Sequence, residues 1–590
     1  MKLENRTEYP RPQLVRDDWT SLDGAWDFAF DDADEGLKNH WERGFVPTHK
    51  IRVPFSYETK ASGIGDPSVH EVVWYRKRIA VPAMNDRQTL LLHFEGSDYE
   101  TTVWANGVLL GTHTGGYERF SFDLKKVLPT DEITLVVRVF DSLSTEQPRG
   151  KQRYRPESWG CWYVQTTGIW KSVWMERVQK THLSRLVINA DADRGTVVVT
   201  GILNERRKTY ADRLIVKVYR DGETVAEGQA GADGADKFLC TLTVPNARRW
   251  RPEDPALYEV EARLMRGEET IDTVRSYFGF RTLAWKRDGL YLNGELTYLR
   301  LVLDQGYWKD SGLTPPSTDA LRADLDAVVR YGYNGMRKHQ KIEDERFLFL
   351  CDLYGILVFG EMAAAYAYSE EAEARFTDEW ERIVVQNGQH PCIVAWVPFN
   401  ESWGIPKVAS DRRQQAFTER IYALTKSLDP TRPVIANDGW EHTRSDFVTI
   451  HDYRENGDEL SAMHGDGDEA VLRGERSYSW YGQKLFASGY AYEGQPLLLS
   501  EYGGIAFACE DGWGYGKQVA SEKDYLERFL SQNDAIRKMP QFSGFCYTQL
   551  TDVEQEKNGL LTADREEKLS EQGVAALYAS NTAFSHSTAR

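Results

Sequence analysis

The 590-residue chain lacks any long apolar stretch, and this absence limits where the protein can reside. No run of about 18 apolar residues occurs, which is the length that a membrane-spanning helix requires. The first dozen residues contain no apolar core of the kind that a secretory signal peptide carries. We therefore expect no membrane association and a cytoplasmic location.

Cysteine is scarce, with six residues spread along the chain and no CxxC pair. Cysteines scattered in this way indicate neither a disulfide framework nor a zinc-binding motif. Cys351, Cys392 and Cys546 lie within apolar segments and are expected to be buried free thiols. This pattern is typical of a protein from a reducing compartment.

Positive charge is also in deficit, since the formal net charge is −18. Nucleic acids and anionic membranes are negatively charged, so an acidic surface does not attract them and neither is expected as a partner. No glycine-rich phosphate loop of the GxxxxGKS/T or GxGxxG kind occurs, so we expect no nucleotide cofactor.

Motifs that bind catalytic metals are missing as well, because no HxH or HExxH spacing occurs. Some acidic residues and histidines that follow expected strands could still supply oxygen and nitrogen ligands to a metal. These are Asp304, His339, Glu361, His451 and Asp452. Without a supporting motif, no metal site is predicted.

Aromatic residues are plentiful at 12% of the chain, with 18 Trp and 30 Tyr. Flat aromatic rings bind the apolar faces of sugars, so this excess fits a carbohydrate-handling protein. It fits equally well a protein rich in β-structure, where Trp and Tyr are common. The composition alone does not decide between the two.

The first 283 residues contain short strand-like runs separated by turns. Within residues 1–180, Asn106-Gly107 lies between two such runs and is a strong hairpin signal. This region is predicted to be a jelly-roll β-sandwich of the sugar-binding type. Residues 181–283 continue with about seven short strands, the size of an immunoglobulin-like β-sandwich.

Residues 284–590 change to an alternation of strands and helices. Eight strands over about 300 residues are the size and period of a (β/α)8 TIM barrel. The strands are expected at 296–303, 334–339, 355–362, 392–399, 433–437, 447–451, 496–500 and 541–548. Helices are expected at 317–331, 343–354, 371–388, 409–427 and 521–537. The long segment 454–495, with Tyr478, Trp480 and Tyr481, is predicted to be a binding or lid loop or a small surface helix.

Two glutamates stand out because each ends a short apolar run. Glu401 follows the fourth expected strand of the barrel and Glu501 ends the seventh. TIM barrels place their active sites at the carboxyl ends of the strands, so the two carboxyl groups should face each other. Enzymes that hydrolyse glycosides use two facing carboxyl groups, one as proton donor and one as nucleophile or base.

Other side chains at the strand ends are candidates to hold a sugar or to tune the glutamates. Arg337 and Tyr453 could each donate a hydrogen bond to Glu501 and keep it charged. Asn400 is expected to hold a sugar hydroxyl beside Glu401. The remaining candidates for substrate binding are His339, Asp304, Trp440 and Tyr547.

The order of the three parts, together with the segments 400–403 and 500–503, resembles glycoside hydrolase family 2. The segments 94–96, 103–107, 115–117 and 167–174 are similar to that family's N-terminal sugar-binding domain. The resemblance covers nearly the whole chain. It implies that Glu401 is the acid/base and Glu501 the nucleophile of a retaining, double-displacement mechanism. It also implies that Asn400, Arg337 and Tyr453 assist them, and that a homodimer or homotetramer is plausible.

The identity of the sugar stays open, because the chain departs from the family's sequence pattern at positions that are expected to contact the substrate. Leu303-Asp304-Gln305-Gly306 replaces an Asn-Arg-His-Glu-like segment, and Tyr547 replaces a Trp. The Asn-x-Lys motif of glucuronidases is not visible in 556–559, which disfavours a uronic acid. We expect an exo-glycosidase, first a β-galactosidase and otherwise a β-glucuronidase, β-mannosidase, arabinosidase or galactofuranosidase. A non-catalytic carbohydrate-binding protein is the alternative from another class.

Overall fold

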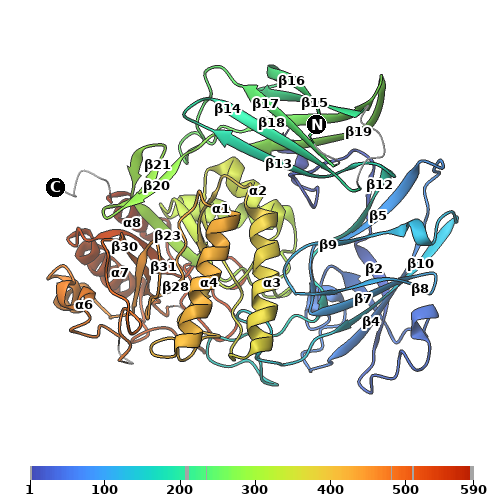
Figure 1. The fold of residues 1–590 in the computed structure, drawn as a ribbon. Coiled ribbons are helices and arrows are strands. Elements are labelled where there is room, and N and C mark those ends of the chain that lie inside the picture. The colour runs from blue at the N-terminus through green and yellow to red at the C-terminus, as the bar shows by residue number, and fades with distance from the viewer. Residues whose placement is uncertain (1–2, 206–211, 234–235, 480–481, 508–510, 585–590) are drawn as a thin grey trace.

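A computed structural model describes residues 3–205, 212–233, 236–479, 482–507 and 511–584 of the chain. Three bodies follow one another along the sequence: an N-terminal β-sandwich, a middle β-sandwich and a barrel (Figure 1). The middle sandwich, in green, lies above the barrel in this view, and the N-terminal sandwich, in blue, lies beside it. The predicted order of jelly roll, immunoglobulin-like sandwich and TIM barrel is confirmed.

The N-terminal sandwich packs a four-stranded sheet against a six-stranded sheet. The first consists of β1 (Trp19–Ser21), β12 (Val173–Gln179), β5 (Gln88–Phe94) and β9 (Phe120–Asp123). The second consists of β3 (His49–Val53), β2 (Gly24–Phe30), β4 (Val72–Ala80), β10 (Glu132–Phe140), β7 (Glu100–Ala105) and β8 (Val108–Thr114). Alternate residues of β10, including Leu135, Val137 and Val139, point into the shared core. The predicted hairpin at Asn106-Gly107 joins β7 to β8, with both residues at positive φ.

Smaller elements complete this domain. A two-stranded sheet pairs β6 (Ser97–Asp98) with β11 (Gly168–Ile169). Single 3-10 turns lie at η1 (Leu3–Arg6), η2 (Trp41–Arg43), η3 (Lys60–Ser62) and η4 (Leu124–Lys126). The connection 141–167 between β10 and β11 reaches the barrel: the amide of Arg149 donates to the carbonyl of Ala364 at 3.0 Å. Tyr366 Oη donates to the carbonyl of Gly150 at 2.6 Å, so this connection lies against the barrel near the end of its third strand.

The middle sandwich is a continuous antiparallel array in the order β13-β14-β17-β16-β15-β18-β19. Its strands are β13 (Leu183–Asp191), β14 (Thr196–Leu203), β15 (Asp212–Arg220), β16 (Glu223–Asp233), β17 (Lys237–Thr243), β18 (Tyr258–Arg266) and β19 (Glu269–Phe278). The strict alternation of buried and partly exposed residues in β14 and β15 places Val197, Val199, Val216 and Val218 in one core. A small meander of β20 (Leu283–Lys286), β21 (Gly289–Leu292) and β22 (Glu295–Thr297) leads into the barrel.

The barrel has its eight strands close to the predicted places. Seven form one parallel sheet, ordered β26 (Ile393–Val397), β25 (Leu357–Glu361), β24 (Gly335–Lys338), β23 (Leu299–Asp304), β31 (Phe542–Thr548), β30 (Leu497–Gly503) and β29 (Val448–Asp452). The fourth strand continues past Pro398 as β27 (Phe399–Asn400), which pairs with β28 (Asn437–Asp438). Of the predicted strand 433–437, only Asn437 belongs to β28, which ends one residue later at Asp438. These strands are buried on both faces, as parallel barrel strands are.

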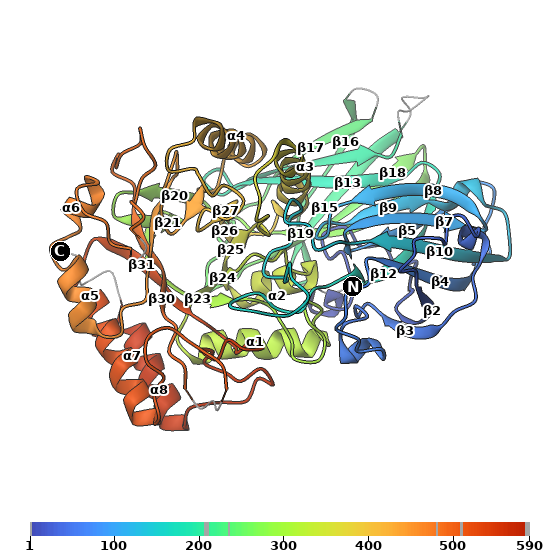
Figure 2. The same cartoon turned by 90° about the horizontal axis from the view of Figure 1, so that it is seen from below.

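Helices cover the outside of the barrel (Figures 1 and 2). They are α1 (Thr318–Arg330), α2 (Glu345–Tyr354), α3 (Glu370–Asn387), α4 (Arg412–Leu428), α5 (Gly457–His464), α6 (Glu469–Leu472), α7 (Glu522–Arg537) and α8 (Glu571–Thr582). The side chains of Ser317, Asp344, Ser369, Asp411 and Ser521 accept backbone N–H bonds at the starts of α1, α2, α3, α4 and α7. Helix α8 lies where no helix was predicted. In the described part of the chain, no helix is long and apolar enough to cross a membrane.

Candidate active site

The alternation of side chains along the barrel strands selects which polar groups meet at the mouth. Register pairs Leu303 with Arg337 and Asp304 with Lys338 across β23 and β24. Because successive residues point to opposite faces, Arg337 faces the interior and Lys338 the exterior. Polar residues at the strand ends that belong to one connected interior network are Arg337, His339, Glu361, Asn400, Glu401, Asp438, His451, Tyr453, Glu501 and Thr548.

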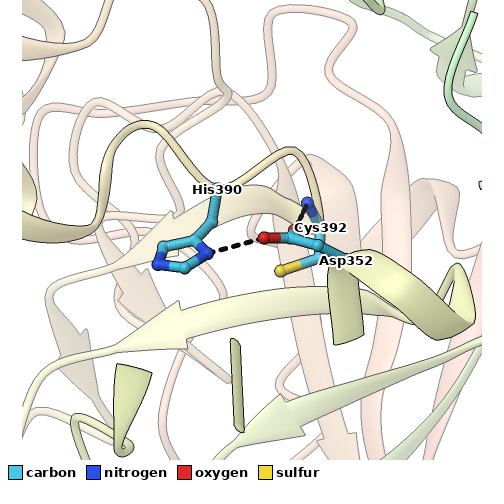
Figure 3. A group of neighbouring side chains, drawn as sticks. All are labelled: Asp352, His390 and Cys392. Carbon is cyan, nitrogen blue, oxygen red and sulfur yellow. Dashed lines mark hydrogen bonds and ion pairs between the residues drawn. The ribbon is translucent and has the colours of Figure 1, made fainter. Parts of the chain in front are cut away.

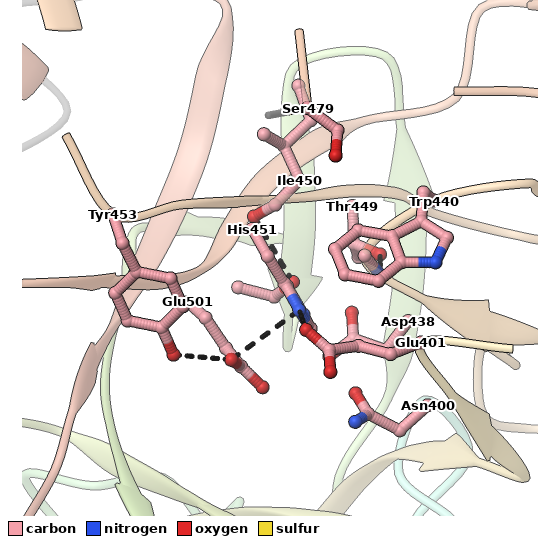
Figure 4. Close-up of polar contacts among 12 residues, drawn as sticks. Asn400, Glu401, Asp438, Trp440, Thr449, Ile450, His451, Tyr453, Ser479 and Glu501 are labelled. Atoms are coloured by element: carbon pink, nitrogen blue, oxygen red, sulfur yellow. Dashed lines mark hydrogen bonds and ion pairs between the residues drawn. The ribbon is translucent and has the colours of Figure 1, made fainter. Parts of the chain in front are cut away.

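Glu501 lies at the centre of this network and is 4% exposed. Arg337 Nη1 donates to Glu501 Oε1 at 2.7 Å, and Tyr453 Oη donates to Glu501 Oε2 at 2.5 Å. His451 Nδ1 lies 3.5 Å from the same Oε2 (Figure 4). Tyr453 is itself fixed by stacking on Tyr515, with ring centroids 3.4 Å apart. The predicted contacts of Arg337 and Tyr453 with Glu501 are therefore present.

Glu401 approaches Glu501 from the end of β27. It has a φ of +50° and Ser402 a φ of +60°, so the chain turns sharply in the left-handed region immediately after Asn400. The turn directs the Glu401 carboxylate to His451, whose Nδ1 lies 2.8 Å from Oε1. A carboxylate oxygen of Glu401 and one of Glu501 lie within 4.8 Å of each other. The Glu401 side chain is 20% exposed, so a ligand can reach it.

His451 links three carboxylates. Its Nε2 lies 3.2 Å from Asp438 Oδ2, opposite the contact with Glu401. Burial alone would lower the pKa of His451, but the negative charges of Glu501, Asp438 and Glu401 raise it to about 10. Burial would raise the pKa of Glu401, yet the hydrogen bond and charge of His451 lower it overall, with smaller help from Lys151. The unliganded site therefore holds an imidazolium between ionised carboxylates.

The two polar atoms of the Asn400 side chain differ: the oxygen has a hydrogen-bond partner, and the nitrogen has none among the described residues. Its Oδ1 accepts from Arg337 Nη2 at 2.6 Å. Its Nδ2 is buried and has no hydrogen-bond partner among the described residues. A buried donor without a partner is costly unless a ligand completes it. The arrangement suits a sugar hydroxyl beside Glu401.

Glu361 contacts Arg337 and His339 within the network. Its Oε2 accepts from Arg337 Nε at 2.6 Å, and its Oε1 lies 2.9 Å from His339 Nδ1. Burial raises the pKa of Glu361 to about 7, against the opposing effect of the Arg337 charge. Burial, assisted by the nearby charges of Lys151 and Arg337, lowers the pKa of His339 well below its usual value. The predicted binding residue His339 is thus a neutral group within the site.

Trp440 also lies at the site, as predicted. Its ring meets that of His451 edge to face with centroids 5.6 Å apart, and it stands beside Glu401 in Figure 4. Its backbone carbonyl accepts from Asn437 Nδ2 at 2.7 Å. The half-buried ring forms one wall near Glu401.

Two predicted binding residues lie elsewhere, and strand alternation explains both errors. Asp304 shares the exterior face with Lys338: its Oδ2 accepts from Lys338 Nζ at 2.6 Å and its Oδ1 from the amide of Gly306. Tyr547 faces α7, where its hydroxyl lies 2.7 Å from that of Tyr525. The interior position of β31 belongs to Thr548, whose Oγ1 lies 3.0 Å from Tyr453 Oη. Both side chains are therefore held by partners outside the network around the two glutamates.

Several residues near the site were not predicted, and they come from the connection 141–167 and the segment after β31. Trp162 packs edge to face on Trp403, with centroids 5.4 Å apart. Lys151 Nζ donates to Cys161 Sγ at 3.3 Å and lies close enough to Glu401 to lower its pKa. Glu556 accepts from Tyr163 Oη at 2.5 Å. The unusual length of this aromatic-rich connection was the available signal.

Among its described residues, the segment 454–495 supplies no hydrogen bond to Glu401 or Glu501. It contains α5 and α6, so the expectation of a small surface helix is met, and Tyr478 Oη donates to the carbonyl of Gly439. Trp480 and Tyr481 lie outside the described residues. A lid function for this segment stays a prediction.

The residues that were weighed as metal ligands are not gathered into one group. Asp304 pairs with Lys338, and Asp452 pairs with Arg454 and His464. Two other groups place carboxylate, histidine or thiol atoms close together: Glu401, His451 and Glu501 form one, and Asp352, His390 and Cys392 form the other. In the first, both ring nitrogens of His451 already have protein partners, Glu401 and Asp438.

The carboxylate of Asp352 in the second group is occupied by the protein's own donors (Figure 3). Asp352 Oδ2 accepts from Tyr277 Oη and lies 2.7 Å from His390 Nδ1, while its Oδ1 accepts from the amide of Cys392 at 2.8 Å. All of these residues are buried. Since Tyr277 belongs to β19, the group joins the middle sandwich to the barrel.

Fold and site together define a glycosidase: a TIM barrel whose mouth holds two facing carboxylates on the fourth and seventh strands. Sequence models of the glycosyl hydrolases family 2 match all three domains. The sugar-binding domain matches residues 19–176, the family's middle domain 181–281 and its TIM barrel domain 289–581. The chain belongs to glycosyl hydrolases family 2, which confirms the resemblance.

Relatives within this family carry two different activities in their names. A β-glucuronidase from Canis lupus familiaris is 25% identical over 90% of this chain and 84% of its own. A β-galactosidase from Bacteroides ovatus is 26% identical over 72% of this chain and 51% of its own. The chain spans 44% of the length of a relative from Formosa agariphila.

Solved structures share the fold at lower identity. The structure of Bifidobacterium dentium β-glucuronidase complexed with coumarin-3-O-glucuronide has a TM-score of 0.79 and 20% identity, covering 96% of this chain and 98% of its own. A β-glucuronidase from Ruminococcus gnavus in complex with D-glucuronic acid has a TM-score of 0.79 and 18% identity, covering 97% and 99%. At these identities the likeness concerns the fold.

Proposed function

We propose that the protein is a retaining exo-β-glycosidase that removes a terminal sugar by double displacement. The observation that carries this proposal is the approach of Glu401 and Glu501, whose oxygens lie within 4.8 Å of each other. Retaining enzymes hold the two carboxyl groups about 5–5.5 Å apart, whereas inverting enzymes separate them by about 6.5–9.5 Å to admit a water. The short separation supports direct attack by one carboxylate on the sugar.

In the first step, Glu501 attacks the anomeric carbon. A bond forms between a Glu501 oxygen and that carbon, the bond to the leaving oxygen breaks, and the leaving oxygen takes a proton from Glu401. Arg337 and Tyr453 hold the Glu501 carboxylate in place by one hydrogen bond to each of its oxygens. The free Nδ2 of Asn400 is available to the hydroxyl next to the anomeric carbon.

His451 is the source of the proton for this step. Glu401 has a lowered pKa, while the adjacent His451 holds a proton 2.8 Å away. We infer that this proton passes from His451 Nδ1 to Glu401 when the leaving oxygen occupies the site. In the second step a water attacks the anomeric carbon, gives its proton to Glu401, and the ester bond to Glu501 breaks.

For the sugar, we propose a β-galactoside first. The side chain of Asn558 is occupied by Glu556 and Gln549, at 3.0 and 2.7 Å. This segment therefore presents a carboxylate, rather than an Asn and a Lys, and a carboxylate repels a uronic acid. A β-glucuronide is the second candidate, because several relatives and structural neighbours are named as β-glucuronidases.

A panel of p-nitrophenyl glycosides tests the proposal. It includes the β-galactoside, β-glucuronide, β-mannoside, β-glucosaminide, arabinoside and galactofuranoside. We expect turnover of the β-galactoside, with the β-anomer of the free sugar appearing first in proton NMR. An α-anomer as first product contradicts retention, and no turnover of any member favours a non-catalytic carbohydrate-binding protein.

A further inference from the structure

Two buried charges of opposite sign lie beside the catalytic glutamates and come from different domains. Lys151 belongs to the connection 141–167 of the N-terminal sandwich, and Glu556 follows the last barrel strand. In Figure 2 the teal connection between β10 and β11 extends from the blue sandwich toward the barrel. Lys151 is 7% exposed and Glu556 is 2% exposed.

Contacts connect both side chains to the mouth of the barrel. Lys151 Nζ lies 5.9 Å from the ring centre of Trp162, which packs on Trp403, two residues after Glu401. Asn558 joins Glu556 to Gln549, the residue after Thr548. Burial lowers the pKa of Lys151, and Cys161, Tyr366, Glu556 and Glu401 raise it. Burial raises the pKa of Glu556; Lys151 opposes this rise and Glu501 adds to it.

Two hydrogen bonds hold the Glu556 carboxylate in place and leave acceptor positions on it. Tyr163 Oη donates to Oε2 at 2.5 Å and Asn558 Nδ2 to Oε1 at 3.0 Å. A carboxylate has about four acceptor positions, so two remain. The position is held from both domains, because Tyr163 is a sandwich residue and Asn558 a barrel residue.

Lys151 is held less completely. Its Nζ donates to Cys161 Sγ at 3.3 Å and lies 5.9 Å from the ring centre of Trp162. In the described ranges, no carboxylate forms an ion pair with it within 4.0 Å. An ammonium group has three donors, and a thiol is a weak acceptor for one of them. At least two strong donors of a buried cation are therefore available.

We propose that Lys151 and Glu556 form a clamp for the hydroxyl groups of an uncharged terminal sugar, with Lys151 as donor and Glu556 as acceptor. A hydroxyl both donates and accepts, so two neighbouring hydroxyls satisfy both charges without adding a third. A sugar carboxylate would pair with Lys151 but meet Glu556 at close range. The inference rests on the proposed glycosidase function and names its substrate class as neutral glycosides.

The clamp also gives the N-terminal sandwich a direct part in the reaction. Its connection 141–167 supplies one charge of the pair and the Tyr163 hydroxyl that positions the other. The sugar would be held across the joint between domains. Docking of the sandwich would therefore determine how tightly the terminal sugar binds.

The test combines protein variants with deoxy substrates. Lys151→Met and Glu556→Gln are compared with the control variants Lys557→Met and Glu566→Gln. Lys557 is half-buried and lines a cavity of about 770 Å³ with Trp308, and Glu566 is exposed. Each variant is assayed with the p-nitrophenyl β-galactoside and with its 3-, 4- and 6-deoxy analogues.

For the intact galactoside, we expect kcat/KM to fall about 10- to 100-fold in Lys151→Met and Glu556→Gln, as when a buried charged hydrogen bond is lost. The controls should stay within about twofold of the wild type. The loss should shrink to about twofold for the deoxy analogue that lacks the clamped hydroxyl, because that contact is already missing.

Equal losses on all substrates would show that the two residues only position the loop, which overturns the clamp. Unchanged variants with an active wild type overturn it too, while the proposed function stands. Preference of the wild type for the β-glucuronide, lost only in Lys151→Met, overturns the neutral substrate class. A wild type that cleaves no glycoside of the panel overturns the proposed function itself.

Discussion

Two groups of similar composition lie in one barrel and do different work. Glu401, His451 and Glu501 meet at the mouth, whereas Asp352, His390 and Cys392 lie at the joint with the middle sandwich. Both contain a carboxylate hydrogen-bonded to a histidine, at 2.8 Å in the first and 2.7 Å in the second. Composition and proximity alone would rank them equally as functional sites.

The groups differ in whether a ligand can reach them. Both oxygens of Asp352 are occupied by Tyr277, His390 and the amide of Cys392, and the group is fully buried. At the mouth, Glu401 is partly exposed and the Nδ2 of neighbouring Asn400 has no partner among the described residues. The buried Nε2 of His390 also has no partner among the described residues, so an unpaired donor or acceptor alone does not separate the two groups. What separates them is access: a ligand can reach Glu401, whereas the joint is closed to solvent.

The sharpest way to break this comparison is to remove the nucleophile. Glu501→Gln should reduce kcat by at least about 10⁴-fold, because no covalent intermediate can form, with little change in the unfolding temperature. Glu501→Gly should regain activity with azide, which enters the space and attacks the sugar. Activity near that of the wild type in Glu501→Gln would contradict the assignment.

The acid/base should show a loss that depends on the leaving group. Glu401→Ala should lower the rate about 10²–10⁴-fold for alkyl glycosides, which need a proton for their leaving oxygen. Dinitrophenyl glycosides, whose leaving group departs without a proton, should lose much less in the first step. Equal losses for both substrates, measured as kcat/KM, would show that Glu401 is not the acid.

Sequence reasoning located the two glutamates of the proposed catalytic pair but misjudged part of their surroundings. Apolar runs that end in Glu401 and Glu501 are strong local signals, because parallel barrel strands are buried on both faces. Asp304 and Tyr547 were misplaced because one residue of error at a strand end turns a side chain to the opposite face. Thr548, one residue further, holds the interior position.

Other parts of the site could not be read from local sequence. Lys151 and Tyr163 reach the mouth from another domain, and only tertiary packing brings them to Glu556. The break in the fourth strand at Pro398 is a local signal that fits the loss of a backbone donor. Helix α8 was missed because its apolar residues form no distinct stripe along the helix.

His451 should have a smaller effect on rate and a visible effect on pH dependence. His451→Gln should lower kcat/KM about tenfold or more for substrates that need a proton, since the proposed source of that proton is gone. Its raised pKa of about 10 also contributes stability. That contribution is fully present below about pH 6.5, the pKa in the unfolded chain, and is lost as pH rises through 10.

Thermal unfolding between pH 6 and 10 separates this contribution from other titrations. Over this pH range the unfolding temperature of the wild type should fall further than that of His451→Gln, because only the wild type carries the buried imidazolium. Parallel curves for the two proteins would mean that His451 is neutral in the folded state. The proton source that we infer for Glu401 would then be absent.

The joint should respond in the opposite way to the mouth. Asp352→Asn keeps the shape but replaces an acceptor by a donor facing Tyr277 and His390, which should cost about 1–3 kcal/mol of stability. Activity per folded molecule should stay within about twofold, because this group lies away from the catalytic network. The measurement pairs calorimetry with active-site titration by a slow fluoroglycoside. A large loss of kcat in the folded fraction would show that the joint is coupled to the mouth, since packing that holds β19 on the barrel would then also set the geometry of the glutamates.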